Sequence, residues 1–376
     1  MNKTLRTLAA LAIGSVASCA PTGNGIALLN DADFEADVPT GHVSLYTLKA
    51  GDLVMQMTNF GGRVVSLWTP DKDGNYADIE LGHATADEYI NFKSERFLGA
   101  AVGPVANRIG KGTFTVDGET YNTPHNNNGN TLHGGLIGID MVAWTVVEKT
   151  DNSITMEYTH PDGQEGFPGN LAMTMKYTLT EDNEFKVEYT ATTDKATPVN
   201  LSHHSFFNLH GKADTCINDL IMTIKADATT AIDDKLIPTG ELAPVAGTAF
   251  DFNTPTAIGD RVDSEELANG KGYDNNWVLT RETESEVEFA ARVEDPVTGR
   301  VLEVYTDQPG LQFYGGNFFN GKSCDKYGDP MIFRGSIALE AQNFPDAINN
   351  PSFPESILRP GETYKATTVY KFSVKK

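Results

Sequence analysis

Three of the eight histidines lie in two short segments, LHGG at residues 132–135 and NLSHHSFFN at residues 200–208. Two carboxylates have similar polar neighbours: Glu340 in LEAQNFPD (residues 339–346) and Asp274 in GYDNNW (residues 272–277). A histidine can act as a general acid near neutral pH, and a carboxylate can act as a general base. Together with the amides beside them, these residue types are typical of an enzyme that moves protons on a polar, uncharged substrate.

Each of these groups also has a plain structural interpretation. His204 lies in a strand-like segment with two phenylalanines, so it could be a hydrogen-bonded core histidine. His133 could be a turn residue, and Asp274 could lie in a surface loop. Glu340 gives the sharper signal, because it follows the apolar run GSIAL (residues 335–339) at the expected end of a strand. A carboxylate there is costly to desolvate unless it is paired or used.

The sequence favours neither metal nor cofactor chemistry. His203 and His204 are neighbours on an expected strand, so they should point to opposite faces and cannot readily share one ion. The motifs H-E-x-x-H and G-x-S-x-G are absent, and no serine or cysteine nucleophile accompanies the histidines. GNFFNGKS at residues 316–323 matches a phosphate-binding loop, but Gly328 and Pro330 follow where its helix should begin. We therefore expect no bound metal, nucleotide or other cofactor.

The first residues have the pattern of an export signal. Lys3 and Arg6 precede an apolar run over residues 8–17, which is too short for a membrane span. The run ends in VASC at residues 16–19, which resembles a bacterial lipoprotein signal. We interpret residues 1–18 as a lipoprotein signal peptide, Cys19 as the lipid-bearing first residue, and residues 19–39 as a lipid-anchored tether. The alternative is ordinary secretion with Cys19 incidental. Either way, we expect an exported protein. The lipoprotein interpretation places it in the periplasm or cell envelope, touching the membrane only through its lipid anchor.

The acidic charge limits the classes of molecule that the protein can bind, and the cysteine content limits the disulfides that it can form. The formal charge is -22, and removing residues 1–18 would leave 27 basic and 51 acidic side chains, a charge of -24. Such a surface repels nucleic acid and anionic lipid, and it disfavours a phosphorylated substrate unless a local cationic pocket overrides it. Besides Cys19, only Cys216 and Cys324 are present, so one disulfide is possible after export but cannot be assigned.

Period-two alternation predicts the fold class. On residues 185–191, Phe185, Val187 and Tyr189 alternate with polar side chains, and similar patterns recur along the chain between Asp-Gly and Thr-Gly turns. No segment has a long, capped helical period, and no linker or repeat interrupts the chain after residue 40. We therefore expect an all-β chain that folds as one antiparallel sandwich or barrel domain over residues 40–376. The sequence leaves open whether the protein is a monomer or a homodimer.

Nine segments, taken together and in this order, resemble the aldose 1-epimerase (galactose mutarotase) family. The resemblance spans about residues 40–374, and it implies a large antiparallel β-sandwich, the galactose mutarotase-like supersandwich, with the site on its concave face. The matching segments are NFGG (59–62), GPVANRI (103–109), LHGG (132–135), PDGQEGFPG (161–169), NLSHHSFFNL (200–209), YDNNW (273–277), PGLQFY (309–314), GNF (316–318) and LEAQNFPDAIN (339–349).

The resemblance also implies roles for individual residues. It places the catalytic base on Glu340 and the catalytic acid on His204. One departure is His203, which stands where family members commonly carry asparagine, and this puts in doubt only the hydrogen bonding beside the acid. The positions that match substrate-binding residues of the family are Arg108, His133 and Asp274, with Asn107 and Gln312 as secondary contacts.

The activity implied by the resemblance is the interconversion of the α and β anomers of free aldoses such as glucose and galactose. Two other classes remain as alternatives: a glycoside hydrolase that uses Asp274 and Glu340 as its carboxylate pair, and a non-catalytic carbohydrate-binding sandwich. The first would leave the two histidines and Arg108 without a task, and the second would not need an acid and a base. A hexose-6-phosphate epimerase is opposed by the acidity and the expected export. The preferred aldose cannot be read from the sequence.

Overall fold

Alternation of apolar and polar residues produces long strands with one buried face. In the computed structural model, which describes residues 25–376, β14 (Leu171–Leu179) buries every second side chain, and β15 (Glu184–Thr193) does the same. These two strands pair antiparallel over nine residue pairs from Leu171–Thr193 to Leu179–Phe185. The ladders between named strands are all antiparallel, as expected from the turn-punctuated sequence.

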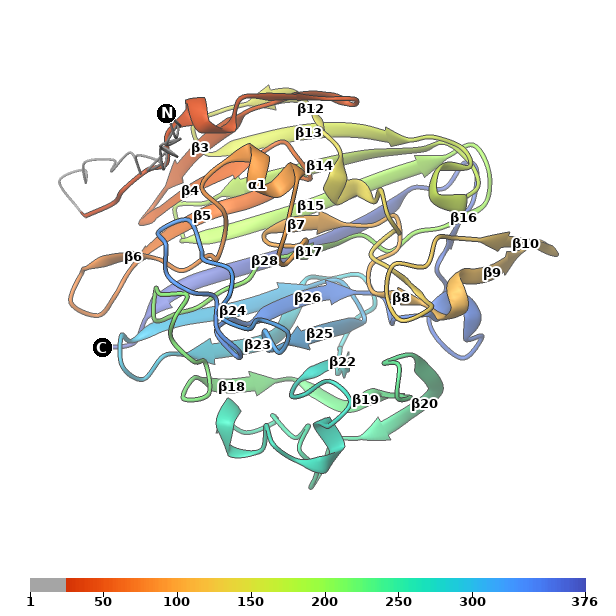
Figure 1. Ribbon diagram of the computed structural model, residues 1–376. Helices are drawn as coiled ribbons and strands as arrows, with labels where there is room; N and C mark the ends of the chain where they lie inside the picture. Colours follow the sequence, from red (N-terminus) through yellow and green to blue (C-terminus); the bar gives the residue numbers. More distant parts are fainter. Residues whose placement is uncertain (1–24) are drawn as a thin grey trace, which may run out of the picture.

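One layer of the molecule is a nine-stranded sheet that crosses the back of Figure 1. Its strands, in spatial order, are β12 (Thr145–Lys149), β13 (Ser153–His160), β14, β15, β28 (Tyr364–Val374), β24 (Arg300–Thr306), β23 (Glu288–Glu294), β18 (Ile221–Ile224) and β21 (Thr256–Ala257).

The second layer is assembled from three sheets that lie edge to edge. At its centre, the short pair of β7 (Ala100–Val102) and β17 (Ser202–His204) lies beside β26 in front of the large sheet (Figure 1). A four-stranded sheet contains β3 (Leu45–Ala50), β4 (Leu53–Thr58), β5 (Arg63–Pro70) and β6 (Tyr76–Asp78). A five-stranded sheet contains β20 (Pro238–Pro244), β19 (Ala226–Ile232), β22 (Asp274–Leu279), β25 (Gly310–Tyr314) and β26 (Ala338–Gln342).

Short ladders and single helical turns complete the described chain. The two-stranded ladders are β1 (Ala36–Val38) with β2 (Gly41–Val43), β8 (Arg108–Ile109) with β11 (Thr131–Leu132), β9 (Thr113–Val116) with β10 (Glu119–Asn122), and β16 (Thr197–Pro198) with β27 (Ile357–Leu358). The helical segments are α1 (Ala86–Ile90), η1 (Asp31–Phe34), η2 (Gly110–Gly112), η3 (Ile139–Met141), η4 (Gln164–Gly166), η5 (Ile258–Asp260), η6 (Glu265–Leu267) and η7 (Ala347–Asn349).

The main hydrophobic core fills the space between the two layers. Met175 and Tyr370 from the large sheet and Leu67, Phe313 and Leu339 from the facing layer belong to one cluster, and each is nearly or fully buried. Burying one large apolar side chain stabilises the fold by about 1.5–3 kcal/mol. The core therefore holds the front strands rigidly, and their outer face is left to carry polar side chains. The architecture confirms the predicted antiparallel β-sandwich.

The folded part of the chain begins earlier than the sequence predicts. The backbone of Leu29 exchanges hydrogen bonds of 2.8 and 3.0 Å with the Gln56 side chain, and Phe34 in η1 is fully buried. Ile26 is buried as well, so residues from Ile26 onward pack on the domain, and the expected tether over residues 19–39 must be shortened at its C-terminal end. The signal peptide and Cys19 lie outside the described residues. None of the helices in the described part of the chain has the length and hydropathy of a membrane span.

The two cysteines within residues 25–376 are both free thiols. Cys216 is half-buried and Cys324 is exposed. The disulfide that the sequence left open is therefore not formed between them.

Candidate active site

Strand β17 turns its two histidines to opposite faces. His203 points into the core between the layers, where Nδ1 lies 3.2 Å from the hydroxyl of Tyr177 and Nε2 lies 2.9 Å from that of Ser205. His204 points outward and stacks on Phe206, with ring centroids 4.6 Å apart. This confirms the predicted alternation, and it places His204 on the face of the layer that carries the other candidate residues.

The register of the five-stranded sheet aligns the acidic candidates. Gln312 of β25 is directly opposite Glu340 of β26, and Asp274 of β22 is opposite Tyr314. Alternate residues of a strand share a face, so Asp274, Gln312 and Glu340 all lie on the face turned away from Trp277 and Phe313 of the core.

Two tight turns bring Arg108 and His133 to the same place. Asn107 and His133 both adopt the left-handed conformation, with φ of 59° and 49°. The His133 amide donates to the Asn107 carbonyl at 2.9 Å, and the Asn107 amide donates to Nδ1 of His133 at 3.0 Å. Because Nδ1 accepts a hydrogen bond, the neutral ring must carry its proton on Nε2. His133 is therefore set to donate a hydrogen bond into the pocket.

An ion pair and its amide partners form one wall. Arg108 Nη2 lies 3.3 Å from Asp274 Oδ2, and Gln312 Nε2 donates to Asp274 Oδ1 at 2.7 Å. The guanidinium also donates to the side-chain oxygens of Asn107 and Asn127, each at 3.3 Å. Both oxygens of Asp274 are engaged, so this carboxylate is held in one orientation. Asn127 was not anticipated from the sequence.

The acid and base candidates are neighbours at the bottom of the pocket. Nε2 of His204 lies 3.4 Å from Oε1 of Glu340, and the two side chains are 6% and 2% exposed. Neither His204 Nδ1 nor Glu340 Oε2 has a hydrogen-bond partner among the described residues. Burial, with the charge of Asp274 adding to it, raises the pKa of Glu340 well above its usual value, although Arg108 opposes the shift. Burial likewise lowers the pKa of His204 to about 3.

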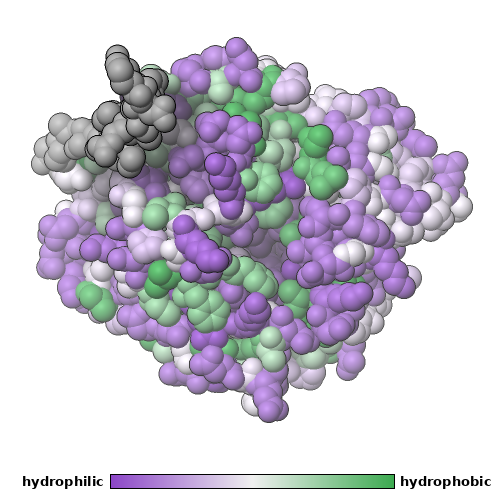
Figure 2. Space-filling view, viewed as in Figure 1, coloured by the Kyte–Doolittle hydropathy of each residue, from purple (hydrophilic) through white to green (hydrophobic). Residues whose placement is uncertain are grey.

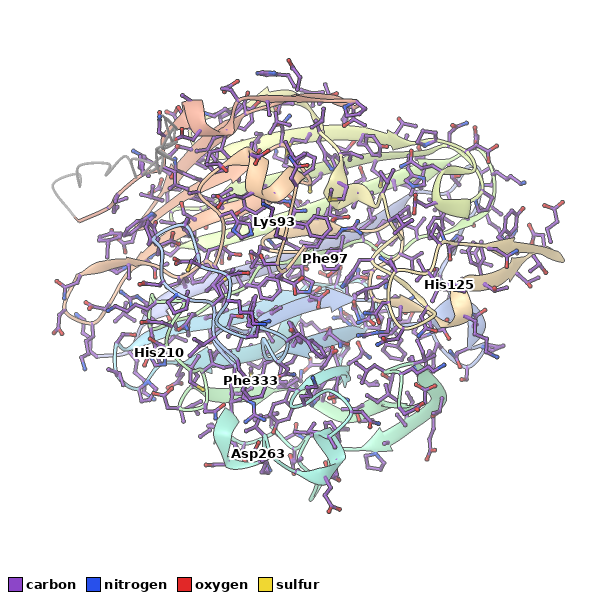
Figure 3. The ribbon with its side chains drawn as sticks, in the orientation of Figure 1. Lys93, Phe97, His125, His210, Asp263 and Phe333 are labelled. Atoms are coloured by element: carbon purple, nitrogen blue, oxygen red, sulfur yellow. The ribbon has the colours of Figure 1, made fainter. Side chains whose placement is uncertain are left out.

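These side chains line a cavity of about 480 Å³, within the size range of small-molecule sites. The surface is hollowed near the centre of the face shown in Figure 2, close to Phe97 in Figure 3. Of the seven residues assigned from the resemblance, six line this cavity and Gln312 lies behind Asp274. The lining residues are Phe92, Ser94, Glu95, Arg96, Phe97, Asn107, Arg108, Asn126, Asn127, Leu132, His133, Leu136, His204, Asp274, Tyr314, Phe318 and Glu340.

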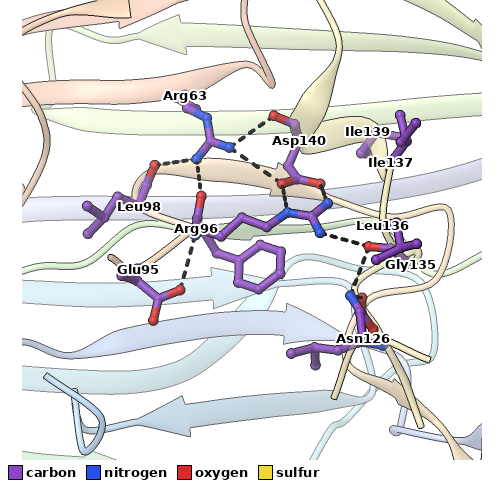
Figure 4. Close-up of polar contacts among 12 residues, drawn as sticks. Arg63, Glu95, Arg96, Leu98, Asn126, Gly135, Leu136, Ile137, Ile139 and Asp140 are labelled. Atoms are coloured by element: carbon purple, nitrogen blue, oxygen red, sulfur yellow. Dashed lines mark hydrogen bonds and ion pairs between the residues drawn. The ribbon is translucent and has the colours of Figure 1, made fainter. Parts of the chain in front are cut away.

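A buried arginine–aspartate cluster supports the other wall (Figure 4). Arg96 pairs with both oxygens of Asp140 at 2.7 Å and donates to the Gly135 carbonyl at 2.8 Å. Arg63, which is fully buried, donates to the carbonyls of Arg96 (2.7 Å) and Asp140 (3.0 Å). The cluster ties the segment before β7 to the turn that carries His133.

Several lining residues escaped the sequence reasoning. Phe97 packs edge-on against the His133 ring with centroids 4.6 Å apart, and Tyr314 faces His204 at 6.3 Å. Glu95 contributes a third pocket carboxylate, and its Oε1 accepts a hydrogen bond of 3.1 Å from the Phe97 amide. The segment FKSERF at residues 92–97 has no periodicity or motif that could have indicated this position.

One group in the pocket has the composition of a metal site. His133, His204 and Glu340 can each offer one ligand atom, and these atoms lie within 4.8 Å of one another. The hydrogen bond from Asn107 opposes coordination by His133, because Nδ1 is already an acceptor and Nε2 carries the proton. The expectation that the site works without a metal stays a prediction.

Comparison with known proteins agrees with this geometry. The family model for aldose 1-epimerase matches residues 44–371. The chain is 44% identical to human galactose mutarotase over 334 residues, covering 89% of this chain and 95% of that protein. It is 36% identical to the aldose 1-epimerase of Escherichia coli (strain K12) over 326 residues, covering 85% and 92%.

Solved structures give the same result. An aldose epimerase homologue from C. elegans superposes with a TM-score of 0.82 at 30% sequence identity, covering 89% of this chain and 100% of that one. Galactose 1-epimerase from Lactobacillus acidophilus NCFM superposes with a TM-score of 0.77 at 27% identity, covering 91% and 97%. The chain therefore belongs to the aldose 1-epimerase family.

Proposed function

We propose that this protein is an aldose 1-epimerase that interconverts the α and β anomers of free aldoses, with Glu340 as base and His204 as acid. The observation that carries the proposal is the contact of 3.4 Å between these two side chains at the bottom of a small polar pocket. Membership of the family supports the same reaction.

The reaction requires two proton transfers and no net change in the protein. Glu340 removes the proton of the C1 hydroxyl while the protonated His204 gives its proton to the ring oxygen. The bond between C1 and the ring oxygen breaks, and C1 becomes an aldehyde carbon. After rotation about the C1–C2 bond, the ring oxygen attacks the other face of the carbonyl and the two residues exchange roles. A positioned acid or base contributes about 10²–10⁴-fold each.

Burial determines which of the two residues, Glu340 or His204, carries the proton that they share. Desolvation raises the pKa of Glu340 and lowers that of His204, so the empty pocket favours one shared proton with both groups neutral. A bound sugar can donate a hydrogen bond to the ionised Glu340 and accept one from the protonated His204. These two bonds favour the ionic form of the pair. Ring opening then returns the pair to the neutral form. Burial thus stabilises the stage at which the sugar is an open-chain aldehyde.

The remaining polar groups suit an uncharged sugar. Nε2–H of His133 can donate to a hydroxyl, and Arg108 and Asp274 can hold hydroxyls as donor and acceptor. Because Arg108 is already paired with Asp274, it has no free charge to offer a phosphate. Because Asp274 is held by Arg108 and Gln312, it is poorly placed to serve as a glycosidase nucleophile. Asn107 and Gln312 act by orienting Arg108 and Asp274.

The proposal includes export and lipid anchoring at Cys19, in the periplasm or another part of the cell envelope. Its support is the signal-like sequence of residues 1–19. Ile26 is already buried against the domain, so residues 19–25 are left to connect the anchor to it.

Polarimetry tests the function directly. The purified protein should accelerate mutarotation of freshly dissolved α-glucose, α-galactose or α-xylose above the buffer rate, and the three rates will identify the preferred aldose. Activity should persist in a chelator. If no aldose is accelerated, the proposed function is wrong. If chelator abolishes the activity and a divalent ion restores it, the metal-free mechanism is wrong.

A further inference from the structure

A second row of polar side chains lies next to the catalytic row of the five-stranded sheet. In the catalytic row, Asn276 is paired with Gln312, and Gln312 with Glu340. In the next row, Gly310 of β25 is paired with Gln342 of β26. Because Gln342 is two residues after Glu340, its side chain lies on the same face. Two buried amides, Gln342 two residues along β26 and Asn276 on the far side of Gln312, thus lie on the same face as the base.

These amides are buried without hydrogen-bond partners. Asn276 is 1% exposed and Gln342 is 0% exposed, and both polar atoms of each side chain have no partner among the described residues. The same holds for Oε1 of Gln312 and Oε2 of Glu340. Burying one such group without a hydrogen bond costs about 1–3 kcal/mol, so proteins rarely leave several together.

Gly310 allows this arrangement. A Cβ atom at this position would lie 2.5 Å from Oδ1 of Asn276 and 3.1 Å from Cδ1 of Phe344. The Asn276 amide therefore lies directly over the glycine, and Phe344 closes the row at its outer end. We refer to Asn276, Gly310 and Gln342 as the amide row.

We propose that the amide row holds ordered water, and that this water donates a hydrogen bond to Oε2 of Glu340. The inference rests on the proposed function, since it assigns the row a role in stabilising the ionised carboxylate of the base when it forms. The four N–H groups of Asn276 and Gln342 and the acceptors Oε1 of Gln312 and Oε2 of Glu340 supply the three or so partners that a buried water requires. Asn276 and Gln342 are then positioning residues that act on Glu340 through water.

Such water would offset the effect of burial on the pKa of Glu340. Desolvation and the Asp274 charge raise the pKa of Glu340, and hydrogen bonds to the ionised carboxylate lower it. Substitutions in the amide row leave the other groups around the carboxylate in place, so a change in its titration reports the loss of water. The charged and titratable groups that face Glu340 are His133, His204, Arg108, Asp274, Glu95 and Tyr370.

The test is the pH dependence of kcat/KM for mutarotation in Gln342→Met and Asn276→Leu. In the free enzyme the pair shares one proton, so the alkaline limb reports loss of that proton from Glu340. This limb should move to higher pH by about one unit, because a hydrogen bond to the ionised carboxylate is lost. On the plateau below that limb, kcat/KM should fall about tenfold, because a smaller fraction of the pair is in the ionic form. Gln56→Met is the matched control: Gln56 is also a buried glutamine, but it is bonded to Leu29 far from the pocket, so its variant should keep the wild-type limb.

A crystal structure of the full wild-type protein provides a measurement that does not depend on how the variants fold. Water should appear within hydrogen-bond distance of both Oε2 of Glu340 and an amide of the row. An amide row without ordered water, or an active enzyme whose alkaline limb is unmoved in both variants, would overturn this inference. A wild-type protein without mutarotase activity would instead overturn the proposed function.

Discussion

Two histidine–carboxylate groups in this molecule differ in almost every physical respect. In the pocket, His204 and Glu340 are 3.4 Å apart, and each has a buried polar atom without a partner. On another side of the molecule (Figure 3), His210 contacts Asp295 through Nδ1 and Asp219 through Nε2, both at 3.0 Å. Asp295 also accepts hydrogen bonds from the Val297 amide (2.8 Å) and the Thr298 hydroxyl (2.6 Å).

The pKa shifts of the two groups run in opposite directions. Burial lowers the pKa of His210, but the hydrogen bonds and charges of Asp295 and Asp219 outweigh it and raise the pKa above 6.5. Burial raises the pKa of Asp295, and its bonds to His210 and Thr298 outweigh this and lower it. In the pocket, desolvation prevails for both members. An ion pair whose polar atoms all have hydrogen-bond partners stabilises the fold. A buried pair with unpartnered polar atoms and shifted pKa values can instead transfer protons to and from a ligand.

The largest expected effect is on catalysis by the pocket pair. Glu340→Gln and His204→Asn should each lower kcat by about a hundredfold or more. The double variant should lose much less than the product of the two, because both residues act in one coupled transfer. Steady-state kinetics, with folding checked by circular dichroism, measure this. Independent, multiplicative losses would show that the two side chains do not form a functional pair.

The next largest effect concerns stability at the other histidine. His210→Asn should lower the free energy of unfolding by about 2 kcal/mol, since Asp295 would stay buried with one partner fewer. The pKa of His210 is raised on folding, so its contribution is complete below pH 6.5 and disappears as pH rises through the folded pKa. Asp295 has a lowered pKa, so its contribution is lost in acid.

Urea unfolding of the wild type and of His210→Asn across pH 4–9 measures the difference between their free energies of unfolding. The gap between the two proteins should be largest in mildly acidic solution and should narrow toward pH 9. A gap that widens as pH rises would mean that His210 is neutral in the folded protein.

Substitutions at the pocket wall should have smaller effects, which divide between binding and catalysis. Arg108→Ala and Asp274→Asn should raise KM and also lower kcat, for a loss of about tenfold or more in kcat/KM, because each removes a charged hydrogen bond to a hydroxyl. Initial rates over a range of sugar concentrations separate the two constants. A change confined to kcat would indicate that these residues contact the reacting atoms and do not grip the substrate.

His203→Asn should change kcat by less than about threefold, because the side chain faces the core and asparagine can still hydrogen-bond there. The matched comparison is His204→Asn, the same substitution one residue further along β17. Abolished turnover in His203→Asn with activity spared in His204→Asn would show that the acid is misassigned.

The smallest kinetic effect is expected at Cys19. Cys19→Ala should move the protein from the membrane fraction to the soluble fraction while leaving kcat and KM unchanged, because Cys19 precedes the packed residues from Ile26 onward. Mass spectrometry of the wild-type N-terminus provides the control. Wild-type protein that carries no lipid and fractionates as soluble would contradict the lipoprotein interpretation.

Local patterns predicted the fold class and drew attention to His133, His204, Asp274 and Glu340, whereas Arg108, Asn107 and Gln312 were added by the resemblance. Alternation along β15 and β17 gives strands, and the two faces of β17 follow from its period of two. The resemblance supplied the roles of the seven, which remain predictions. The cluster of Arg96 and Asp140 could not be foreseen, since its partners are 44 residues apart and no local pattern pairs them.

Two further features depended on tertiary structure. The amide row requires the register of three strands, β22, β25 and β26, which no single segment encodes. The N-terminal boundary was misplaced because residues 25–39 have no regular period, and only the packing of Phe34 against the domain reveals that they are folded.

The most direct test compares the two histidine–carboxylate groups in one experiment. Mutarotation of freshly dissolved α-galactose should be followed by polarimetry with equal amounts of wild type, Glu340→Gln and His210→Asn, each confirmed to be folded. We expect the rate with Glu340→Gln to fall to near the buffer rate and the rate with His210→Asn to stay near that of wild type. Full activity in Glu340→Gln, or an equal loss in the folded His210→Asn, would contradict the assignment of catalysis to the pocket pair.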